Sequence, residues 1–257
     1  MQEVNQIRYN KIKLNTPDNL FIHPIGDTHI GHQNCDLDFI EKELSYIPND
    51  PHHRILLMGD LIDCGIRTSI GASPYEQYLS PNQQLNTIKN LLEPFKEQID
   101  GCVIGNHEYR IAKDSGIDVL EQFCDKLDIP YMLYSGIITY SIGTNGNERA
   151  YNIYMTHGNA GGGVGNALMK CKNLSNKVVA DVYLNGHCHY NSNSERIMKY
   201  VDSRNGKIVE GIQKFVLTGH SLSYDESYAD MANLEISPKG FPIIILKGSN
   251  KKDILVA

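Results

Sequence analysis

The sequence predicts an α/β fold with a partly parallel sheet, because short apolar runs alternate with amphipathic helical segments. Each apolar run is too short for a helix and is rich in β-branched or aromatic residues, as expected of a buried strand. Each run also ends near a glycine beside Asp, Asn or His, which indicates a turn. The predicted strands cover residues 20–25, 55–58, 102–104, 151–156 and 182–184.

Helical segments separate some of these strands. Leu37, Ile40 and Leu44 have the i, i+3, i+7 spacing of one helix face. After residue 200 the helical signal fades, and two late strands are predicted over 215–218 and 242–246. Capping signals and apolar spacing predict three further helices: one that begins at Ser80-Pro81, one capped by Ser115, and one over residues 165–176.

Length and composition bound the class of protein. The chain has 257 residues, 41% hydrophobic and 21% charged, which suits a globular domain with a sizeable core. No repeat, low-complexity tract or long Pro/Gly/Ser linker divides it. We therefore expect a single domain over residues 1–257, with its motifs in 26–190 and its C-terminal strands in 191–257. Within the latter, the polar and aromatic segment 218–228 is either a loop that contacts substrate or an ordinary surface loop.

Charge and cysteine content argue against several functions. The 24 Lys and Arg residues against 30 Asp and Glu give a net charge of −6, unlike proteins that coat nucleic acid with a broad basic face. A local phosphate site stays open, because a bound metal ion adds positive charge that this tally omits. The six cysteines form no CxxC pair, no apolar run reaches the ~18 residues of a membrane span, and no signal-peptide pattern opens the chain. We expect a reduced, cytoplasmic protein without a membrane partner.

The five strand ends carry the same kind of side chains. Open α/β sheets bind ligands at the carboxyl ends of their strands, so these ends are predicted to converge. Residues two apart on extended backbone point to the same side, which pairs Asp27 with His29 and His187 with His189. The motifs in chain order are Gly26-Asp27-Thr28-His29, Gly59-Asp60-Leu61-Ile62-Asp63, Gly105-Asn106-His107-Glu108, His157-Gly158 and Gly186-His187-Cys188-His189.

Together these motifs predict a metal site. Imidazole and carboxylate suit divalent Mn, Fe, Co, Ni and Zn, and an Asn adds a neutral oxygen. Seven candidate ligands are too many for one tetrahedral ion but suit two ions with a shared carboxylate, ~3.5–4 Å apart, which clamp a phosphate for in-line displacement. Taken singly, each motif has an ordinary explanation as a turn, a helix cap or half of a structural zinc site. The candidate ligands are Asp27, His29, Asp60, Asn106, His157, His187 and His189.

The motifs resemble those of the calcineurin-like metallophosphoesterases, whose pattern is D-x-H, G-D, G-N-H-[DE], H and G-H-x-H. The match runs from Asp27 to His189, about two-thirds of the chain. The resemblance implies a four-layer αββα sandwich, two mixed β-sheets flanked by helices, with the metal site at the C-terminal ends of strands. It also implies two divalent metal ions, with Mn expected and Fe, Ni, Zn, Co or Mg as alternatives.

The resemblance further implies a role for each matching residue. Asp60 would bridge the two ions, and His107 would stay unligated beside the scissile phosphate as a proton donor or charge stabiliser. A hydroxide that bridges the metals would attack in line with the leaving oxygen, which a histidine can protonate near pH 7. The implied ligands are Asp27, His29 and His189 for one ion, and Asn106, His157 and His187 for the other.

Departures from the family pattern narrow the branch. Family protein phosphatases carry G-D-x-x-D-R-G, but Cys64 stands here in place of the phosphate-gripping Arg. The compact G-H-x-H resembles the phosphodiesterase and nuclease branch instead, although Glu108 stands where those enzymes more often have Asp. The glycines between Gly158 and Gly165 resemble members encoded by bacteriophages.

Four further residues are candidates for contact with substrate or with a ligand. His32 follows His29 by three positions and can line the pocket or orient a ligand, and Asp63 can hydrogen-bond a ligand histidine or cap the next segment. Arg110 is a candidate phosphate contact, with a solvated surface position as the alternative. His220 lies in the segment 218–228 that can close over substrate.

The expected function is hydrolysis of a phosphate ester by a dinuclear metal-dependent phosphoesterase, in first place a phosphodiesterase or nuclease. The substrate would be a nucleic acid or a nucleotide, and the sequence names no protein partner. One alternative is a phosphomonoesterase or small-nucleotide hydrolase, which the acidic net charge mildly favours over a binder of long duplex DNA. An alternative of another class is a non-catalytic protein-binding scaffold, which the full ligand set disfavours. Fold and metal site alone do not choose among substrates.

Overall fold

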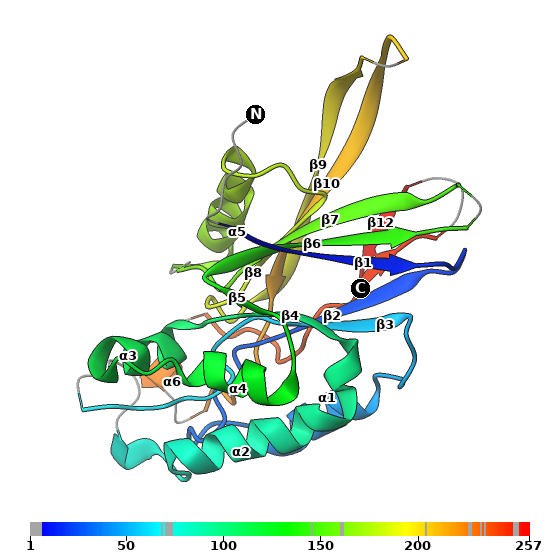
Figure 1. Ribbon diagram of the computed structural model, residues 1–257. Helices are drawn as coiled ribbons and strands as arrows, with labels where there is room; N and C mark the ends of the chain where they lie inside the picture. The colour runs from blue at the N-terminus through cyan, green and yellow to red at the C-terminus, as the bar shows by residue number, and fades with distance from the viewer. Residues whose placement is uncertain are drawn as a thin grey trace.

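Two six-stranded mixed sheets form the centre of the molecule (Figure 1). The computed structural model describes residues 7–67, 69, 74–144, 146–159, 162–203, 205–225, 228–231, 233, 235–248 and 252–257. The first sheet has the order β1 (Arg8–Leu14), β6 (Ser135–Ile142), β7 (Arg149–Thr156), β8 (Val182–Asn185), β10 (Lys207–Thr218), β9 (Asn191–Asp202). The second has the order β12 (Ile254–Val256), β11 (Ile244–Leu246), β2 (Leu20–Ile25), β3 (His53–Leu57), β4 (Ile99–Val103), β5 (Tyr131–Leu133).

The helices lie on the outer faces of the two sheets (Figure 1). The α-helices of the described residues are α1 (Leu37–Ser45), α2 (Pro81–Leu92), α3 (Asn106–Ser115), α4 (Val119–Leu127), α5 (Val164–Asn173) and α6 (Tyr228–Met231). Short 3₁₀ turns are η1 (Pro74–Glu76), η2 (Glu93–Gln98) and η3 (Leu174–Asn176). No described helix is long and apolar enough to cross a membrane.

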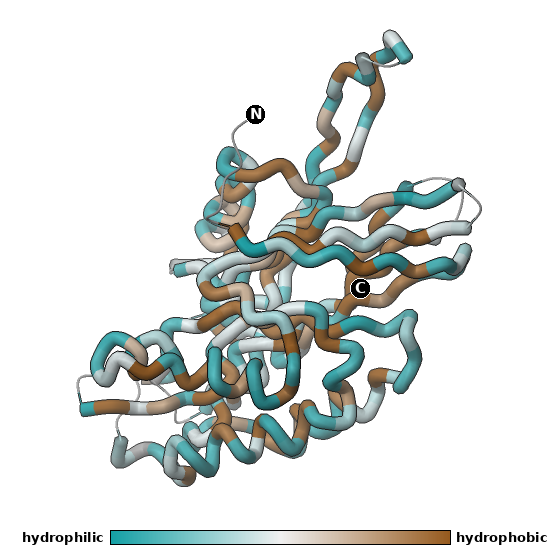
Figure 2. The backbone as a smooth tube through the Cα atoms, in the orientation of Figure 1, coloured by the Kyte–Doolittle hydropathy of each residue, from teal (hydrophilic) through white to brown (hydrophobic). Residues whose placement is uncertain are grey.

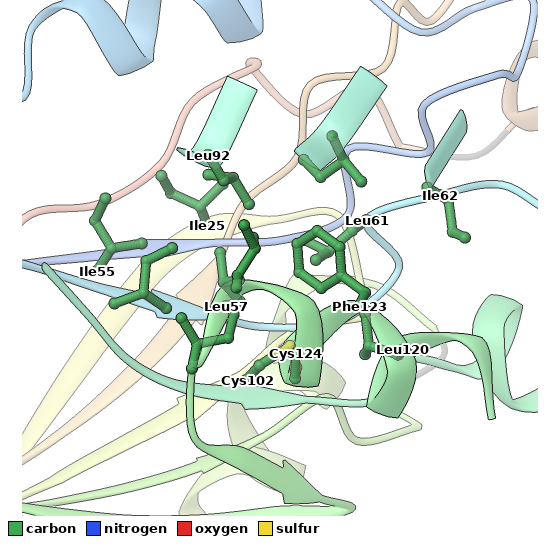
Figure 3. Packing of buried hydrophobic residues seen from close by; sticks show 14 of the residues in the cluster. Ile25, Ile55, Leu57, Leu61, Ile62, Leu92, Cys102, Leu120, Phe123 and Cys124 are labelled. Carbon is green, nitrogen blue, oxygen red and sulfur yellow. The ribbon is translucent and has the colours of Figure 1, made fainter. Parts of the chain in front are cut away.

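Alternate residues of each central strand face different layers. In β3, Ile55 and Leu57 pack against α1, α2 and α4, whereas Leu56 faces the other sheet. Figure 3 shows the layer on the helix side, where Leu92 of α2 and Phe123 of α4 meet the strand residues. This period of two places one apolar face of the strand on each side of the sheet.

A second apolar layer lies between the two sheets, and a third lies under α5. Leu184 of β8 faces the layer between the sheets, and its neighbour Tyr183 faces the layer under α5. In Figure 2 hydrophobic segments run through the strands of both sheets, and hydrophobic and hydrophilic segments alternate along the helices. The order of layers is therefore helices, sheet, sheet, helix, which confirms the predicted α/β sandwich with two mixed sheets.

Strand direction brings the motif-bearing ends together. Strands β2, β3 and β4 run parallel in one sheet, and β7, β8 and β10 run parallel in the other. The motifs follow β2, β3, β4, β7 and β8, so both sheets supply them. The predicted convergence of strand ends therefore crosses the interface between two sheets.

Most predicted elements are confirmed, but the position of one helix start was wrong. Ser115 does not cap a helix; it is the last residue of α3, and its hydroxyl donates to the carbonyl of Ile111. Gly116 (φ +73°) ends that helix, because its left-handed backbone suits glycine. Asp118 caps α4 instead, where its carboxylate accepts from the backbone N–H of Leu120 and Glu121.

A long hairpin formed by β9 and β10 extends beyond the body of the molecule (Figure 1). Its apolar side chains include Ile197, Val201 and Ile208, which are 63%, 71% and 73% exposed.

On the segment 218–228 the structure describes residues up to 225 and Tyr228, so Glu226 and Ser227 lie outside the described residues. The same holds for Gly161 in the glycine-rich stretch.

Candidate metal centre

The loops after β2, β3 and β8 turn sharply at the candidate ligands themselves. Asp27, His29, Asp60, His187 and His189 all have positive φ, between 45° and 68°. Non-glycine residues rarely adopt this left-handed conformation, and functional sites are where it concentrates. The sequence-based explanation of the pairing of these side chains, extended backbone, was wrong. The left-handed turns, and not the period of two of a strand, direct the side chains.

One group of donors gathers Asp27, His29 and His189, whose ligand atoms lie within 4.8 Å of one another. The Nε2 atoms of His29 and His189 are 3.1 Å apart, and Nε2 of His189 is 3.3 Å from Oδ1 of Asp27. The two histidines are 160 residues apart in the chain. The donor atoms of all three residues thus converge on a single point.

A neighbouring group gathers Asp60, His157 and His187, again within 4.8 Å. Asn106 joins it, because its Oδ1 is 3.0 Å from Nε2 of His157 and 2.6 Å from Nδ1 of His187. Asn106 begins α3, directly after β4. The structure therefore brings together all seven sequence-predicted ligands, in the two subsets that the resemblance implied.

Asp60 lies between the two groups. Its Oδ2 is 3.2 Å from Nε2 of His157 and 3.8 Å from Nε2 of both His29 and His107. Its Oδ1 accepts the backbone N–H of His107 at 2.8 Å. One oxygen of a 1% exposed carboxylate therefore faces imidazoles from both groups.

The second ring nitrogen of two histidines is held by other groups. Nδ1 of His157 donates to the carbonyl oxygen of Met58 at 2.8 Å, which leaves Nε2 directed toward Asp60. Nδ1 of His29 is 3.1 Å from Oδ1 of Asp63, which leaves its Nε2 toward His189. Such hydrogen bonds fix ring orientation and tautomer in metal-binding histidines.

Asp63 holds a second histidine in the same way. Its Oδ1 is 3.0 Å from Nδ1 of His107, and the carbonyl oxygen of Asp63 is 2.8 Å from the same nitrogen. Gln77 in turn donates to Oδ2 of Asp63. His29, Asp63 and His107 also lie within 4.8 Å of one another, but Asp63 contacts the Nδ1 atoms that point away from the two groups. We interpret Asp63 as an orienting acceptor for both rings.

Glu108 shapes the loop that carries Asp60. It is fully buried, and its carboxylate accepts the backbone N–H of Gly105, Asp60, Leu61 and Ile62 at 2.7–3.2 Å. Burial and the nearby charge of Asp60 raise the pKa of Glu108 to about 7. Gly105 allows the close approach, because a Cβ there would lie 2.1 Å from Oδ1 of Asp60. The start of α3 and the Asp60 loop are thus locked together.

The field in the site favours bound cations. Asp27 and Asp60 are buried, and among the described residues their ion-pair partners are histidines. Although burial opposes ionisation, His157 lowers the pKa of both carboxyls, aided by His189 at Asp27 and by His107 at Asp60. Burial also disfavours the charged form of His157, but Asp60 and Asp27 raise its pKa to about 10. Ionised carboxylates and imidazoles of this kind fit divalent transition metals.

The other histidines of the site fall into two kinds. Burial and the neighbouring His107 lower the pKa of His29 to about 4, and burial with His157 lowers the pKa of His187. Both rings are therefore neutral near pH 7 and able to donate a lone pair to a metal. His107 differs: burial works against its charged form, yet Asp60 and Asp63 raise its pKa. The resemblance assigns no metal ion to His107, and this is the histidine whose ring lies beside the carboxylates of Asp60 and Asp63.

The remaining sequence candidates lie at different distances from this centre. The ring of His220 stacks on that of His189, 5.3 Å between centroids, and its Nε2 is 3.2 Å from the carbonyl of Ser237. The positive charge of Arg110 opposes the rise in the pKa of His107 without cancelling it. His32 is buried, and its Nδ1 accepts the backbone N–H of Asn34, a local turn contact. Their roles stay predictions.

Sequence reasoning missed the tasks of Glu108 and Gln77. Glu108 falls three residues after Gly105, the spacing of a capping box, and this signal predicts a bond to the start of α3. Its bonds to the Asp60 loop cross 46 to 48 residues and left no local signal. Gln77 likewise reaches Asp63 from a segment without a motif.

Comparison with known proteins places the chain in a family. The model of the calcineurin-like phosphoesterase family matches residues 22–224. No curated protein matches the chain. Among solved structures, a protein of unknown function from Aquifex aeolicus is 18% identical, with a TM-score of 0.35 over 67% of this chain and 81% of that one. A phosphopantetheinyl hydrolase from Mycobacterium tuberculosis is 12% identical, with a TM-score of 0.41 over 83% of this chain and 95% of that one. With most of its residues inside the family match and the family's metal-binding pattern assembled in space, the chain belongs to the calcineurin-like phosphoesterases.

Proposed function

We propose that this metal-dependent phosphoesterase is a dinuclear phosphodiesterase, a class that includes nucleases. The observation that carries the proposal is the position of Asp60, whose Oδ2 faces donors of two adjacent ligand groups. Two ions that share a carboxylate suit in-line displacement at phosphorus. Residues of both sheets meet in the site, so we treat residues 1–257 as one functional domain.

Each ligand group would hold one divalent ion, with Mn²⁺ the first to test. Asp60 would bridge the two ions. When bound, the ions neutralise the charge of the phosphate and lower the pKa of the attacking water. The assigned ligands are Asp27, His29 and His189 for one ion, and Asn106, His157 and His187 for the other.

His107 would serve the leaving group. Its Nδ1 is held by Asp63, so its Nε2 is the atom free to carry a proton to the departing oxygen. The two carboxylates beside the ring favour the protonated form from which a general acid acts. Asp63 and Gln77 keep the ring in place, and Glu108 keeps Asp60 in place.

The residue after Asp63 favours a diester over a phosphoprotein as the substrate. Cys64 occupies the position at which protein phosphatases of this family carry an Arg, and it is buried, 1% exposed. No side chain at that position can therefore grip the additional charge of a monoester dianion. A phosphomonoesterase stays the second candidate, and a comparison of monoester with diester turnover separates the two.

Loss of single ligands tests the assignment. Asp60→Asn and His187→Ala are each expected to abolish hydrolysis of bis-p-nitrophenyl phosphate in the presence of Mn²⁺, because the bridge or one ligand group is lost. Metal content, measured by elemental analysis, is expected to fall in the same variants. Asp114→Asn on the exposed face of α3 and His52→Ala serve as matched controls that keep full activity.

Full activity of Asp60→Asn or His187→Ala would overturn the site assignment. Turnover of p-nitrophenyl phosphate that exceeds turnover of the diester would replace the diesterase by a monoesterase. If the active wild-type protein contains one equivalent of metal and not two, the proposal of a two-ion site is overturned.

A further inference from the structure

A cavity of about 670 Å³ opens beside the metal centre, on the side of the Asn106 and His157 ligand group. Those two residues form part of its lining, so the cavity borders the position at which the proposed function puts the scissile phosphate. Its other walls come from α3, from the turn between β5 and β6, and from α5 with η3. Its volume falls within the ~300–1,000 Å³ of small-molecule sites.

One wall is aromatic. Tyr109 of α3 and Tyr134 of the β5–β6 turn lie edge to face, 5.6 Å between ring centroids, and are 42% and 54% exposed. Hydrogen bonding to the Tyr109 hydroxyl, with a smaller effect of burial, raises the pKa of Tyr134, so this phenol is neutral near pH 7. Large aromatic rings at a cavity wall offer a surface on which a planar ring can stack.

Another part of the wall is basic. Lys170 and Lys177 both line the cavity, and none of the described lining residues is acidic. Lys170 is anchored by a hydrogen bond from its Nζ to the carbonyl oxygen of Asn159 at 3.2 Å. In a chain with a net charge of −6, a wall with two lysines and no carboxylate favours an anion.

The amide side chains of Asn159 and Asn173 complete the lining near these lysines. They offer both donors and acceptors, as the edges of a nucleobase require. The cavity therefore combines a stacking wall, a cationic wall and neutral hydrogen-bonding groups around one volume. A monoester with a small alcohol would use none of the three.

We propose that this cavity is a subsite for a nucleotide unit attached to the scissile phosphate, with its base against Tyr109 and Tyr134 and its own phosphate beside Lys170 and Lys177. The inference rests on the proposed diesterase function and names its substrate class. The same chemistry is present in a free dinucleotide and in a single strand of nucleic acid. The size of the cavity suits one nucleotide unit of either, without a duplex partner.

A ladder of three diesters tests the two walls separately. Methyl p-nitrophenyl phosphate has neither feature, thymidine 5′-(p-nitrophenyl phosphate) adds the base, and the same ester with a 3′-phosphate adds the second anion. For the wild-type protein with Mn²⁺, kcat/KM is expected to rise about tenfold with the base and about three- to tenfold with the phosphate. All three release p-nitrophenol, so one assay serves the whole ladder.

Variants of each wall are expected to remove one step of the ladder. Tyr134→Ala should abolish the gain from the base, and the double variant Lys170→Ala/Lys177→Ala the gain from the phosphate. Both should hydrolyse methyl p-nitrophenyl phosphate at the wild-type rate. Tyr46→Ala, which removes a 66% exposed ring, and Lys126→Ala on α4 lie outside the cavity and should keep the full ladder.

A binding measurement is independent of turnover. Fluorescence anisotropy of a labelled dinucleotide, pTpT, with chelator-treated protein is expected to show binding that each wall variant weakens about tenfold or less and that salt diminishes. A labelled single strand of eight nucleotides distinguishes the two sources: tighter binding than pTpT indicates a strand, and equal binding a free dinucleotide.

The outcomes separate this inference from the proposed function. Equal kcat/KM for all three diesters in an active wild-type protein would overturn the subsite and leave the diesterase intact. So would equal gains in kcat/KM from the base and from the phosphate in wild type and in both variants. Absence of turnover on every diester, with wall-dependent binding of pTpT retained, would overturn the diesterase but not the nucleotide site.

Discussion

His107 differs from the other histidines of the site at the level of single contacts. Its Nδ1 is shared between the carboxylate and the carbonyl oxygen of Asp63, and its Nε2 is 3.8 Å from Oδ2 of Asp60. The ring also lies edge to face with that of His29, 4.3 Å between centroids. It therefore borders both ligand groups without supplying an atom that either of them needs.

Replacement of His107 separates proton transfer from metal binding. His107→Ala is expected to lower kcat for a diester with an alkyl leaving group about 100-fold or more, because a general acid is lost, while metal content stays at the wild-type value. The loss should be smaller for bis-p-nitrophenyl phosphate, because its more acidic leaving group needs less protonation. Metal loss by elemental analysis would show instead that His107 is a ligand, together with His29 and Asp63.

At the scale of elements, the start of α3 and the loop after β3 form one unit. Glu108 ties four backbone N–H groups of this unit to one buried carboxylate. Gly59 allows the two backbones to meet, because it has φ +80° and a Cβ there would lie 2.5 Å from the nitrogen of Gly105. The unit places Asp60 and Asn106, one candidate ligand from each strand end.

Removal of the Glu108 carboxylate should affect both stability and metal affinity. Glu108→Ala leaves four buried N–H donors without acceptors, so we expect a loss on the order of 3 kcal/mol or more in the free energy of unfolding, measured by urea denaturation. Metal affinity should fall as well, since Asp60 loses its support.

Glu108→Gln tests the carboxylate without a change in side-chain shape. It replaces one acceptor oxygen by an NH₂ group, which cannot accept the backbone N–H groups. Glu121→Ala on the exposed face of α4 is the control and should change the free energy of unfolding by about 0.5 kcal/mol or less. A Glu108→Ala protein as stable as this control would contradict the structural role of the carboxylate.

At the scale of the whole molecule, the site joins the two sheets. Asp27, Asp60 and Asn106 follow strands of one sheet, whereas His157 and His187 follow strands of the other. Bound metal would therefore connect the two halves of the sandwich at the ends of their strands, in addition to the apolar layer between them. Binding to the folded state alone raises stability by mass action.

Metal addition should consequently raise the melting temperature. At about 100 times the dissociation constant, one ion adds about 2.7 kcal/mol, which for a protein of this size corresponds to a shift in Tm of roughly 5–10 °C. Differential scanning fluorimetry with and without chelator measures the shift. Asp60→Asn should show a much smaller one; an equal shift in this variant would place the metal elsewhere.

The sequence by itself determined the family, the α/β class and the identity of the candidate ligands. It could do so because each motif is local: a strand, a glycine turn and a donor side chain within four or five residues, such as Gly59-Asp60 or Gly186-His187. Local signals also predicted many of the strands and helices, but not β1, β5, β6, β9, β12 or α3. At Ser115 a helix end was taken for a start.

The resemblance implied which donors share a group, but only the tertiary structure decided how their rings are oriented and what surrounds them. Nε2 of His29 meets that of His189 across 160 residues, and Glu108 reaches Leu61 across 47. The cavity wall of Tyr109 and Tyr134 arises where a helix meets a strand turn. Contacts of this kind depend on the packing of two sheets and leave no period or spacing in the chain, so the sequence predicted the chemistry of the site, and the fold decided its geometry.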